Sequence, residues 1–242
     1  MKLMNPLAGA ESTDSNWNGL YKVGGVAALI MVAITLAQSV SFIVAPPPLE
    51  GNAGDWFALF QKSAFLGLLG FEVLLVIYVL LSVLVSVALF AALRPASQSL
   101  AVLFLVLSVI GAMAFIVARP AFEMLSLSNQ YSAATTDVQR SAILAAGEAM
   151  IAIFQGTAFQ VSYILGSITG LLIAAAMLRS SVFSRTTAYL RIGSSVFDFG
   201  LFIPGIGVFI SLLSVMFLLV FNILVARRLL QLGSSVLKAD GQ

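Results

Sequence analysis

The chain contains neither cysteine nor histidine among its 242 residues. Without cysteine it has no disulfide framework, no thiolate nucleophile and no thiol-ligated metal. Without histidine it has no imidazole for acid–base catalysis or for binding haem, copper or zinc, and no histidine-based pH switch. We therefore expect neither a metal nor a cofactor.

Charge is also scarce, since only 9% of the residues are charged and 60% are hydrophobic. Soluble domains are roughly one-quarter charged. The twelve lysines and arginines are scattered over helix ends and form no patch, so no nucleic-acid partner is expected. The apolar residues form blocks of about 20, the length that a helix needs to cross a bilayer. The sequence therefore predicts an all-α, polytopic integral membrane helix bundle with lipid as its main surroundings.

The predicted bundle has six spans between an N-terminal tail, residues 1–22, and a C-terminal tail, residues 227–242. Prolines and arginines mark several helix ends, because proline cannot continue a helix. The polar stretch 126–140 is predicted to lie in the longest loop between spans. The fourth apolar block, residues 143–178, is too long for one crossing. Its first part is therefore expected outside the hydrocarbon, with possible bends at Gly147 and Gly156. The spans are predicted at about residues 23–44, 65–93, 100–118, 157–178, 187–203 and 207–226.

The basic residues predict the orientation, because lysine and arginine in short loops resist translocation. With six spans, one side receives nine of the twelve basic residues and the other receives Lys62, Arg119 and Arg140. Both termini are therefore predicted in the cytoplasm. In a five-span alternative, residues 188–215 form one bent helix and the C-terminal Arg227-Arg228 pair lies outside.

Ionisable side chains within a membrane are costly, so their depth decides whether they indicate function. Asp198 lies 13 residues after Arg185 and six before Pro204, which places it inside the outer half of its span. It either binds a ligand or serves a structural role, with Ser194 or the long side chain of Arg119 as a possible partner.

Counting residues along each helix, at a rise of about 1.5 Å per residue, places several other polar side chains in the outer half of the membrane. Glu72 falls at the outer boundary, and Glu148 falls beyond it and is expected to be solvated. These positions suggest a polar cleft open to the outer face, and the alternative is a set of unrelated interfacial residues. The ligand-binding candidates are Asp198, Glu72, Gln38, Gln155 and Gln160.

Two patterns occur in the fourth apolar block. Polar residues recur every seven positions, which places them on one face of a continuous helix: Glu148, Gln155, Ser162 and Thr169. Small residues recur every four positions, which lets helix backbones approach closely. This predicted packing seam contains Ser162, Gly166, Gly170 and Ala174.

Three segments resemble the bacterial domain-of-unknown-function family 4386. They are GSITGLLIAAAMLRSSVFSRTTAYLRIGSSV, LFAALRPASQSLAVL and NGLYKVGGVAALI, so the resemblance covers most of the chain. The chain departs from the family at Ser184, where members often have proline. The resemblance implies a membrane fold of six or seven helices. It implies no biochemistry and no functional residues.

Three functions are compatible with these observations. A non-enzymatic accessory or lipid-binding bundle agrees with the small-residue seam and the lack of reactive side chains, and its partners would be the bilayer, other membrane subunits or a second copy. A transporter would use Asp198 for a cation or proton. A lipid-active enzyme would use carboxylates as acid–base groups, although nucleophile elbows, P-loops and dinucleotide motifs are absent.

Overall fold

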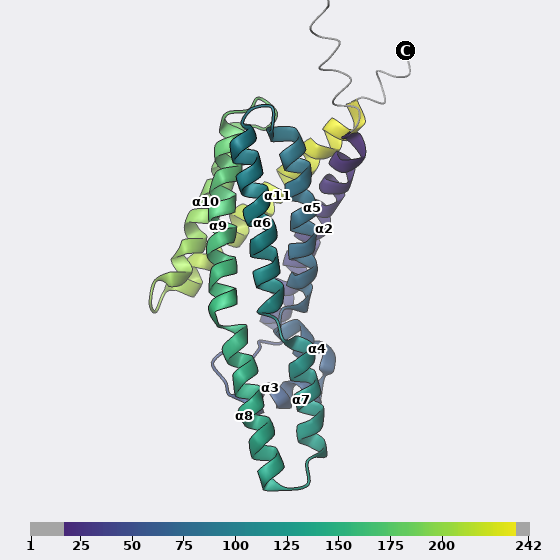
Figure 1. Cartoon of the computed structure of the whole chain (residues 1–242), viewed down its shortest axis with the longest axis vertical. Helices are drawn as coiled ribbons and strands as arrows, with labels where there is room; N and C mark the ends of the chain where they lie inside the picture. The colour runs from purple at the N-terminus through teal and green to yellow at the C-terminus, as the bar shows by residue number, and fades with distance from the viewer. Residues whose placement is uncertain (1–16, 236–242) are drawn as a thin grey trace, which may run out of the picture. The chain divides into compact units, whose positions relative to one another are not determined.

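The computed structural model describes residues 17–235, and every regular element in that range is a helix (Figure 1). The chain forms two compact units. Within the described range, the first unit comprises residues 17–32, 81–108 and 167–235, and the second comprises residues 33–80 and 109–166. The boundaries between them fall inside helices α2, α5, α6 and α9, which therefore contribute residues to both units.

Five helical segments are long and apolar enough to cross a membrane. Their mean hydropathies range from 2.0 to 3.0. This confirms the predicted all-helical, multi-pass membrane class. Three of the segments lie in α2 (Asn18–Val44), α5 (Val73–Leu93) and α11 (Gly207–Ser235). The other two are Gln98–Ala133, which begins with α6 (Gln98–Val117), and Asp137–Leu178, which ends with α9 (Thr157–Leu178).

The predicted fifth span, residues 187–203, is not among these segments. It corresponds to α10 (Arg185–Phe199), which has 15 residues, followed by the short 3-10 helix η1 (Gly200–Phe202). Fifteen residues extend about 22 Å, which is less than the hydrocarbon thickness of about 30 Å. A turn with φ 82° at Gly205 separates α10 from α11, and the two helices pack together (Figure 1). The alternative of a single bent helix over 188–215 is therefore wrong, while a sixth crossing stays a prediction.

Cysteine labelling can decide the number of crossings, because the chain has no cysteine of its own. Thr135→Cys lies between two helices of the second unit, and Ser234→Cys lies near the end of α11; both positions are exposed. With six crossings, an impermeant maleimide is expected to label Thr135→Cys in intact cells, but to label Ser234→Cys only after permeabilisation. Labelling of both variants in intact cells would establish five crossings.

Four other helices form most of the core of the second unit. They are α3 (Ala53–Lys62), α4 (Ala64–Gly70), α7 (Ala121–Ala133) and α8 (Asp137–Phe154), which we call the four-helix group (Figure 1). Their shared core is largely aromatic, and the ring centroids of Trp56 and Phe71 lie 4.4 Å apart. The buried core residues are Ala53, Trp56, Phe57, Phe60, Phe71, Ala121, Met124, Ile151 and Phe154.

Residues 126–140, which were predicted to lie in the longest loop between spans, are mostly helical and belong to α7 and α8. One face of α7 is buried, although many of the side chains of α7 are polar. On that face, Ala121, Met124 and Ser128 recur at helical spacing. The Ser128 hydroxyl also donates a hydrogen bond to a backbone carbonyl of α3. A capping box begins α8, with Thr136 accepting from the backbone N–H of Gln139.

Two predicted continuous segments are interrupted. The span at 65–93 is divided at Phe71 and Glu72, so α4 ends before α5 begins. The fourth apolar block is divided at Gln155–Gly156, which confirms the bend at Gly156. Gly147 instead lies inside α8, where a Cβ atom would meet Ala53 and Phe57 of α3. Because of this break, the four polar residues that recur every seven positions, Glu148, Gln155, Ser162 and Thr169, do not lie on one helix.

Candidate functional site

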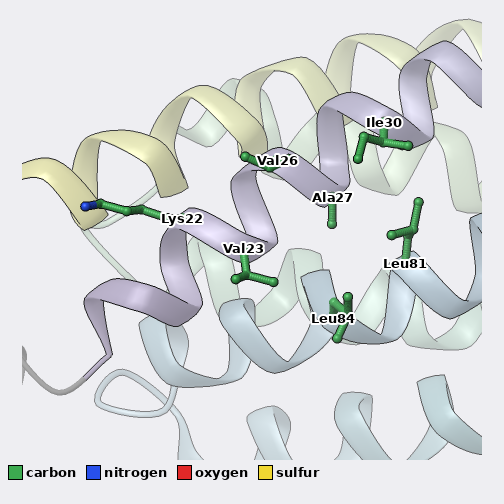
Figure 2. Close-up of a pocket in the computed structure, with 7 residues that line it drawn as sticks. All are labelled: Lys22, Val23, Val26, Ala27, Ile30, Leu81 and Leu84. Atoms are coloured by element: carbon green, nitrogen blue, oxygen red, sulfur yellow. The ribbon is translucent and has the colours of Figure 1, made fainter.

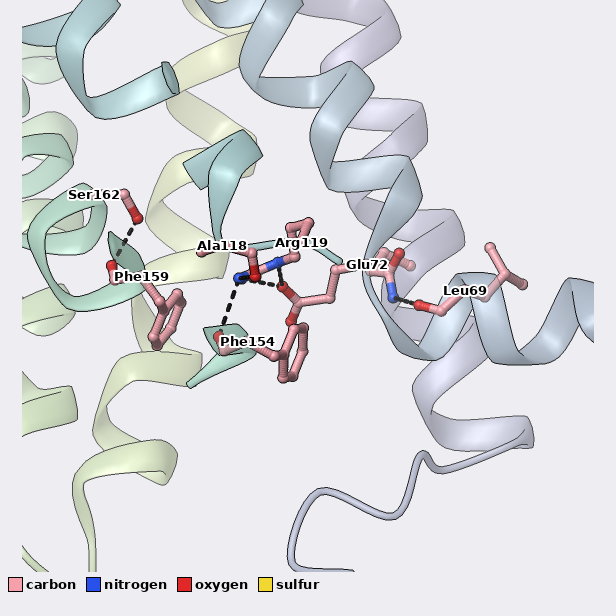
Figure 3. Close-up of polar contacts among 8 residues, drawn as sticks. Leu69, Glu72, Ala118, Arg119, Phe154, Phe159 and Ser162 are labelled. Atoms are coloured by element: carbon pink, nitrogen blue, oxygen red, sulfur yellow. Dashed lines mark hydrogen bonds and ion pairs between the residues drawn. The ribbon is translucent and has the colours of Figure 1, made fainter. Parts of the chain in front are cut away.

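The most enclosed charged group of the second unit is the guanidinium of Arg119, in the link between α6 and α7. Its side chain is only 1% exposed. Nε donates to Oε2 of Glu72 at 2.9 Å, and Nη2 donates to the same oxygen (Figure 3). Nη1 donates to the carbonyls of Ala118 at 3.1 Å and Phe154 at 3.4 Å. These contacts join Arg119 to the beginning of α5 and the end of α8.

Three aromatic rings surround this guanidinium. Its Cζ atom lies 4.0 Å from the ring centroid of Phe115, 4.6 Å from that of Phe154 and 4.9 Å from that of Phe159. A guanidinium over a ring face is attracted by the ring quadrupole, and more strongly where water is excluded. The rings also lower the local dielectric, which strengthens the attraction between Arg119 and Glu72.

Glu72 has an unusual backbone conformation between α4 and α5. Its φ is 59°, the only positive φ of a non-glycine residue in the described part of the chain. A residue with a Cβ pays a steric cost of about 1–3 kcal/mol in such a region. Its side chain is 18% exposed and reaches the buried Arg119. The backbone strain therefore occurs at the residue that supplies the carboxylate of the ion pair.

Gln38 of α2 contacts the same turn. Its Nε2 donates to the carbonyl of Leu69 at 3.0 Å, and that carbonyl also accepts the backbone N–H of Glu72 at 2.9 Å. Gln38 is 6% exposed, and its Oε1 has no hydrogen-bond partner within the described range. Gln38 therefore anchors the end of α4 to α2 within the second unit.

Three more of the polar residues considered in the sequence also bind backbone groups. Gln155 donates to the carbonyl of Leu49 at 3.0 Å, and Gln160 donates to the carbonyl of Gln155 at 3.4 Å. Glu148 is exposed as expected, and it also accepts the backbone N–H of Ala53 at the start of α3 at 2.8 Å. The hydrogen bonds of Gln155 and Glu148 attach α3 and the segment before it to the C-terminal half of α8 and the residue that follows it.

The structure thus brings together residues that the sequence considered separately. Glu72, Gln38, Gln155 and Gln160 all lie in the second unit, whereas Asp198 lies on α10 in the first unit. The sequence proposed Asp198 as the partner of Arg119, and the structure shows Glu72 there. The predicted depth of Glu72 assumed one helix from residue 65 to 93, whereas the structure divides that segment at Phe71 and Glu72. The available signal was a pair of opposite charges near the outer ends of two consecutive spans. Ligand binding by these residues stays a prediction.

The predicted packing seam is not uniform. Ser162 is buried and donates to the carbonyl of Phe159 at 2.7 Å. Gly166 is exposed, and a Cβ added there would meet nothing within 4 Å. Gly170 and Ala174 are buried, and a Cβ at Gly170 would overlap side chains of α10. Close helix packing therefore occurs at Gly170 but not at Gly166.

The first unit contains an apolar groove between α2 and α5, with a volume of about 340 Å³. Lys22 lies at one end of the groove, where its ammonium points away from the apolar lining (Figure 2). The sequence did not predict this feature, because a groove arises only where two helices meet. Its lining residues are Lys22, Val23, Val26, Ala27, Ile30, Leu81 and Leu84.

No group of three or more acidic residues that could hold a metal ion occurs between residues 17 and 235. No curated protein and no solved structure matches the chain. One family model matches residues 26–233, nearly the whole chain, and it bears the description "Domain of unknown function (DUF4386)". The resemblance seen in the sequence is thereby confirmed, and the chain belongs to the DUF4386 family.

Proposed function

We propose that this protein is a non-enzymatic membrane protein of the bacterial inner membrane, and that it binds a phospholipid in the groove between α2 and α5. The groove carries the proposal. Its volume of about 340 Å³ lies within the range of small-molecule sites, about 300–1,000 Å³. Apart from Lys22, its lining is apolar, as expected for a site that holds an acyl chain.

The helical spacing of the lining residues explains the shape of the groove. Val23, Val26 and Ile30 recur on one face of α2, and Leu81 and Leu84 recur on one face of α5. Their side chains form two apolar ridges with the groove between them. All but Leu81 are 40–49% exposed. In a bilayer, these surfaces contact acyl chains rather than water, so a bound chain replaces other lipid without desolvating polar groups.

The charge of Lys22 indicates the class of headgroup. Its side chain is exposed and extends from the end of the groove (Figure 2). A lysine with a long apolar stem places its ammonium at the level of the headgroups. Each such basic residue contributes about 1 kcal/mol to the attraction of anionic lipid. The proposed ligand is therefore an anionic phospholipid with one acyl chain in the groove.

Mass spectrometry of the protein purified in mild detergent tests this proposal. The wild type is expected to retain anionic phospholipid in excess of its share of the membrane. Val26→Trp is expected to abolish this retention by filling the groove, and Lys22→Glu is expected to abolish the preference for anionic headgroups.

Val102→Trp is the matched control, because Val102 is an exposed valine of α6 that does not line the groove. It is expected to retain lipid like the wild type. Equal lipid content in Val26→Trp, Val102→Trp and the wild type would contradict binding in the groove.

A further inference from the structure

The turn between α10 and α11 in the first unit contains no polar side chain. Residues 199–210, which we call the hairpin tip, consist only of glycine, proline and large apolar residues. Every other link between successive α-helices of the described range contains a polar or charged side chain. Turns that face water are usually built from polar residues together with glycine and proline. The composition of the hairpin tip therefore indicates that its surroundings are not aqueous.

The large side chains of the hairpin tip are also exposed rather than packed into a core. Phe202 is 43% exposed and Ile203 is 46% exposed. The values rise to 58% at Ile206 and 72% at Phe209. An exposed apolar patch of this kind marks a surface that contacts another apolar phase, such as a membrane or a protein partner.

The exposed surface of the hairpin tip continues along α11, and this continuity identifies the apolar phase. Exposed apolar residues recur on one face of α11 every three or four positions, which is the spacing of a single helical face. They are 46–72% exposed: Phe209, Leu212, Met216, Val220 and Ile223. Because α11 is long and apolar enough to cross a membrane, this face contacts acyl chains. The same acyl chains can therefore cover the hairpin tip.

The lengths of the two helices place the hairpin tip close to one boundary of the hydrocarbon. Together, α10 and η1 extend about 28 Å from Arg185. Between Gly207 and Arg227, α11 extends about 30 Å. The hydrocarbon is also about 30 Å thick, and any tilt of the helices shortens their reach across it. Because arginines at helix ends lie at the level of the headgroups, neither helix carries the tip beyond the opposite boundary.

The backbone of the hairpin tip satisfies part of its own hydrogen-bonding capacity. The N–H of Ile203 donates to the carbonyl of Gly200 at 2.9 Å, and the N–H of Gly207 donates to the carbonyl of Ile203 at 2.9 Å. Pro204 has no N–H that needs a partner. Internal bonds of this kind are what a backbone requires where water is absent.

We propose that the α10–α11 hairpin ends inside the bilayer, with the side chains of its tip among phospholipid acyl chains near the boundary opposite to Arg185 and Arg227. The hairpin then returns to the side of the membrane from which it starts, without exposing its turn to water. None of the residues of the tip lines the groove between α2 and α5. The proposal therefore does not depend on the proposed lipid site.

Fluorescence quenching of the full-length protein in phosphatidylcholine vesicles tests this depth. The chain has no cysteine, so Ile206→Cys can be labelled with bimane at a single position in detergent and then reconstituted. Its fluorescence is expected to be quenched by phospholipids with brominated acyl chains. It is expected to be almost unaffected by iodide present on both sides of the membrane.

Two matched variants calibrate the two quenchers. Leu213→Cys is the reference for lipid, because Leu213 is 50% exposed on α11, and its quenching by brominated chains is expected to equal that of Ile206→Cys. Ser181→Cys is the reference for water, because Ser181 is exposed in the polar link before α10. Equal iodide quenching of Ile206→Cys and Ser181→Cys would overturn the proposal, because the tip would then lie in water. Quenching of Ile206→Cys by neither agent would also overturn it, because protein, such as a second copy, would then cover the tip.

Discussion

Replacing Arg119 by leucine is expected to lower the free energy of unfolding by about 3–5 kcal/mol, the usual cost of removing one partner of a buried ion pair. The change removes the two hydrogen bonds that Arg119 donates to the carboxylate of Glu72. It also removes the donors to the carbonyls of Ala118 and Phe154. The strained backbone at Glu72 would then lose the ion pair that its side chain forms, although its backbone hydrogen bonds would remain.

Equilibrium unfolding of the wild type, Arg119→Leu, Glu72→Gln and the double variant measures this effect. The double variant is expected to lose less than the sum of the two single losses, because both changes remove the same interaction. Arg140→Leu is the matched control, since Arg140 is an exposed arginine of the same unit. It is expected to change stability by no more than about 0.5 kcal/mol. Equal losses for Arg119→Leu and Arg140→Leu would show that the ion pair contributes nothing.

Replacing Gly170 by alanine is expected to cost about 1–3 kcal/mol, the usual effect of overpacking a close contact. The added methyl would collide with Ser195 and Arg191, so α9 and α10 would have to separate within the first unit. Gly166→Ala is expected to be neutral or to stabilise by about 0.4–1 kcal/mol, since its methyl meets nothing and alanine favours the helix.

The two glycines are four residues apart on the same helix, so each variant is a control for the other. The free energies of unfolding of the two variants and the wild type are compared in the same detergent and buffer. A stabilising Gly170→Ala, or equal losses for both variants, would mean that α10 does not pack against Gly170 as described.

Several polar residues of the second unit have a shared structural role. Arg119 joins the start of α5 to the end of α8, Gln38 joins α2 to α4, and Glu148 joins α8 to α3. Backbone groups near helix ends need such partners, because they lack intrahelical hydrogen bonds. Gln38 and Glu72, two of the residues that were predicted to line a cleft, therefore take part in contacts that hold the second unit together.

Much of the fold was predictable because it depends on short-range patterns. Apolar blocks of membrane-crossing length predicted the helices and the lipid environment. Gly156 was predicted as a bend, and a bend occurs there. The polar side chains of residues 126–140 predicted that they lie in a loop between spans, but did not predict that most of them are helical. Only the tertiary structure identifies the buried face of α7, because Met124 and Ser128 are buried there by contact with α3.

The sequence by itself determined the solvent, the helical class and the family of this protein, because hydropathy and block length act along the chain. Only the tertiary structure decided which side chains meet. It paired Arg119 with Glu72 through a turn that no spacing rule anticipates. It also showed that Gly170 packs closely against α10 whereas Gly166 does not, because packing depends on where another helix crosses. Contacts between residues distant in sequence depend on how the chain turns between helices, and hydrophobic periodicity does not encode those turns.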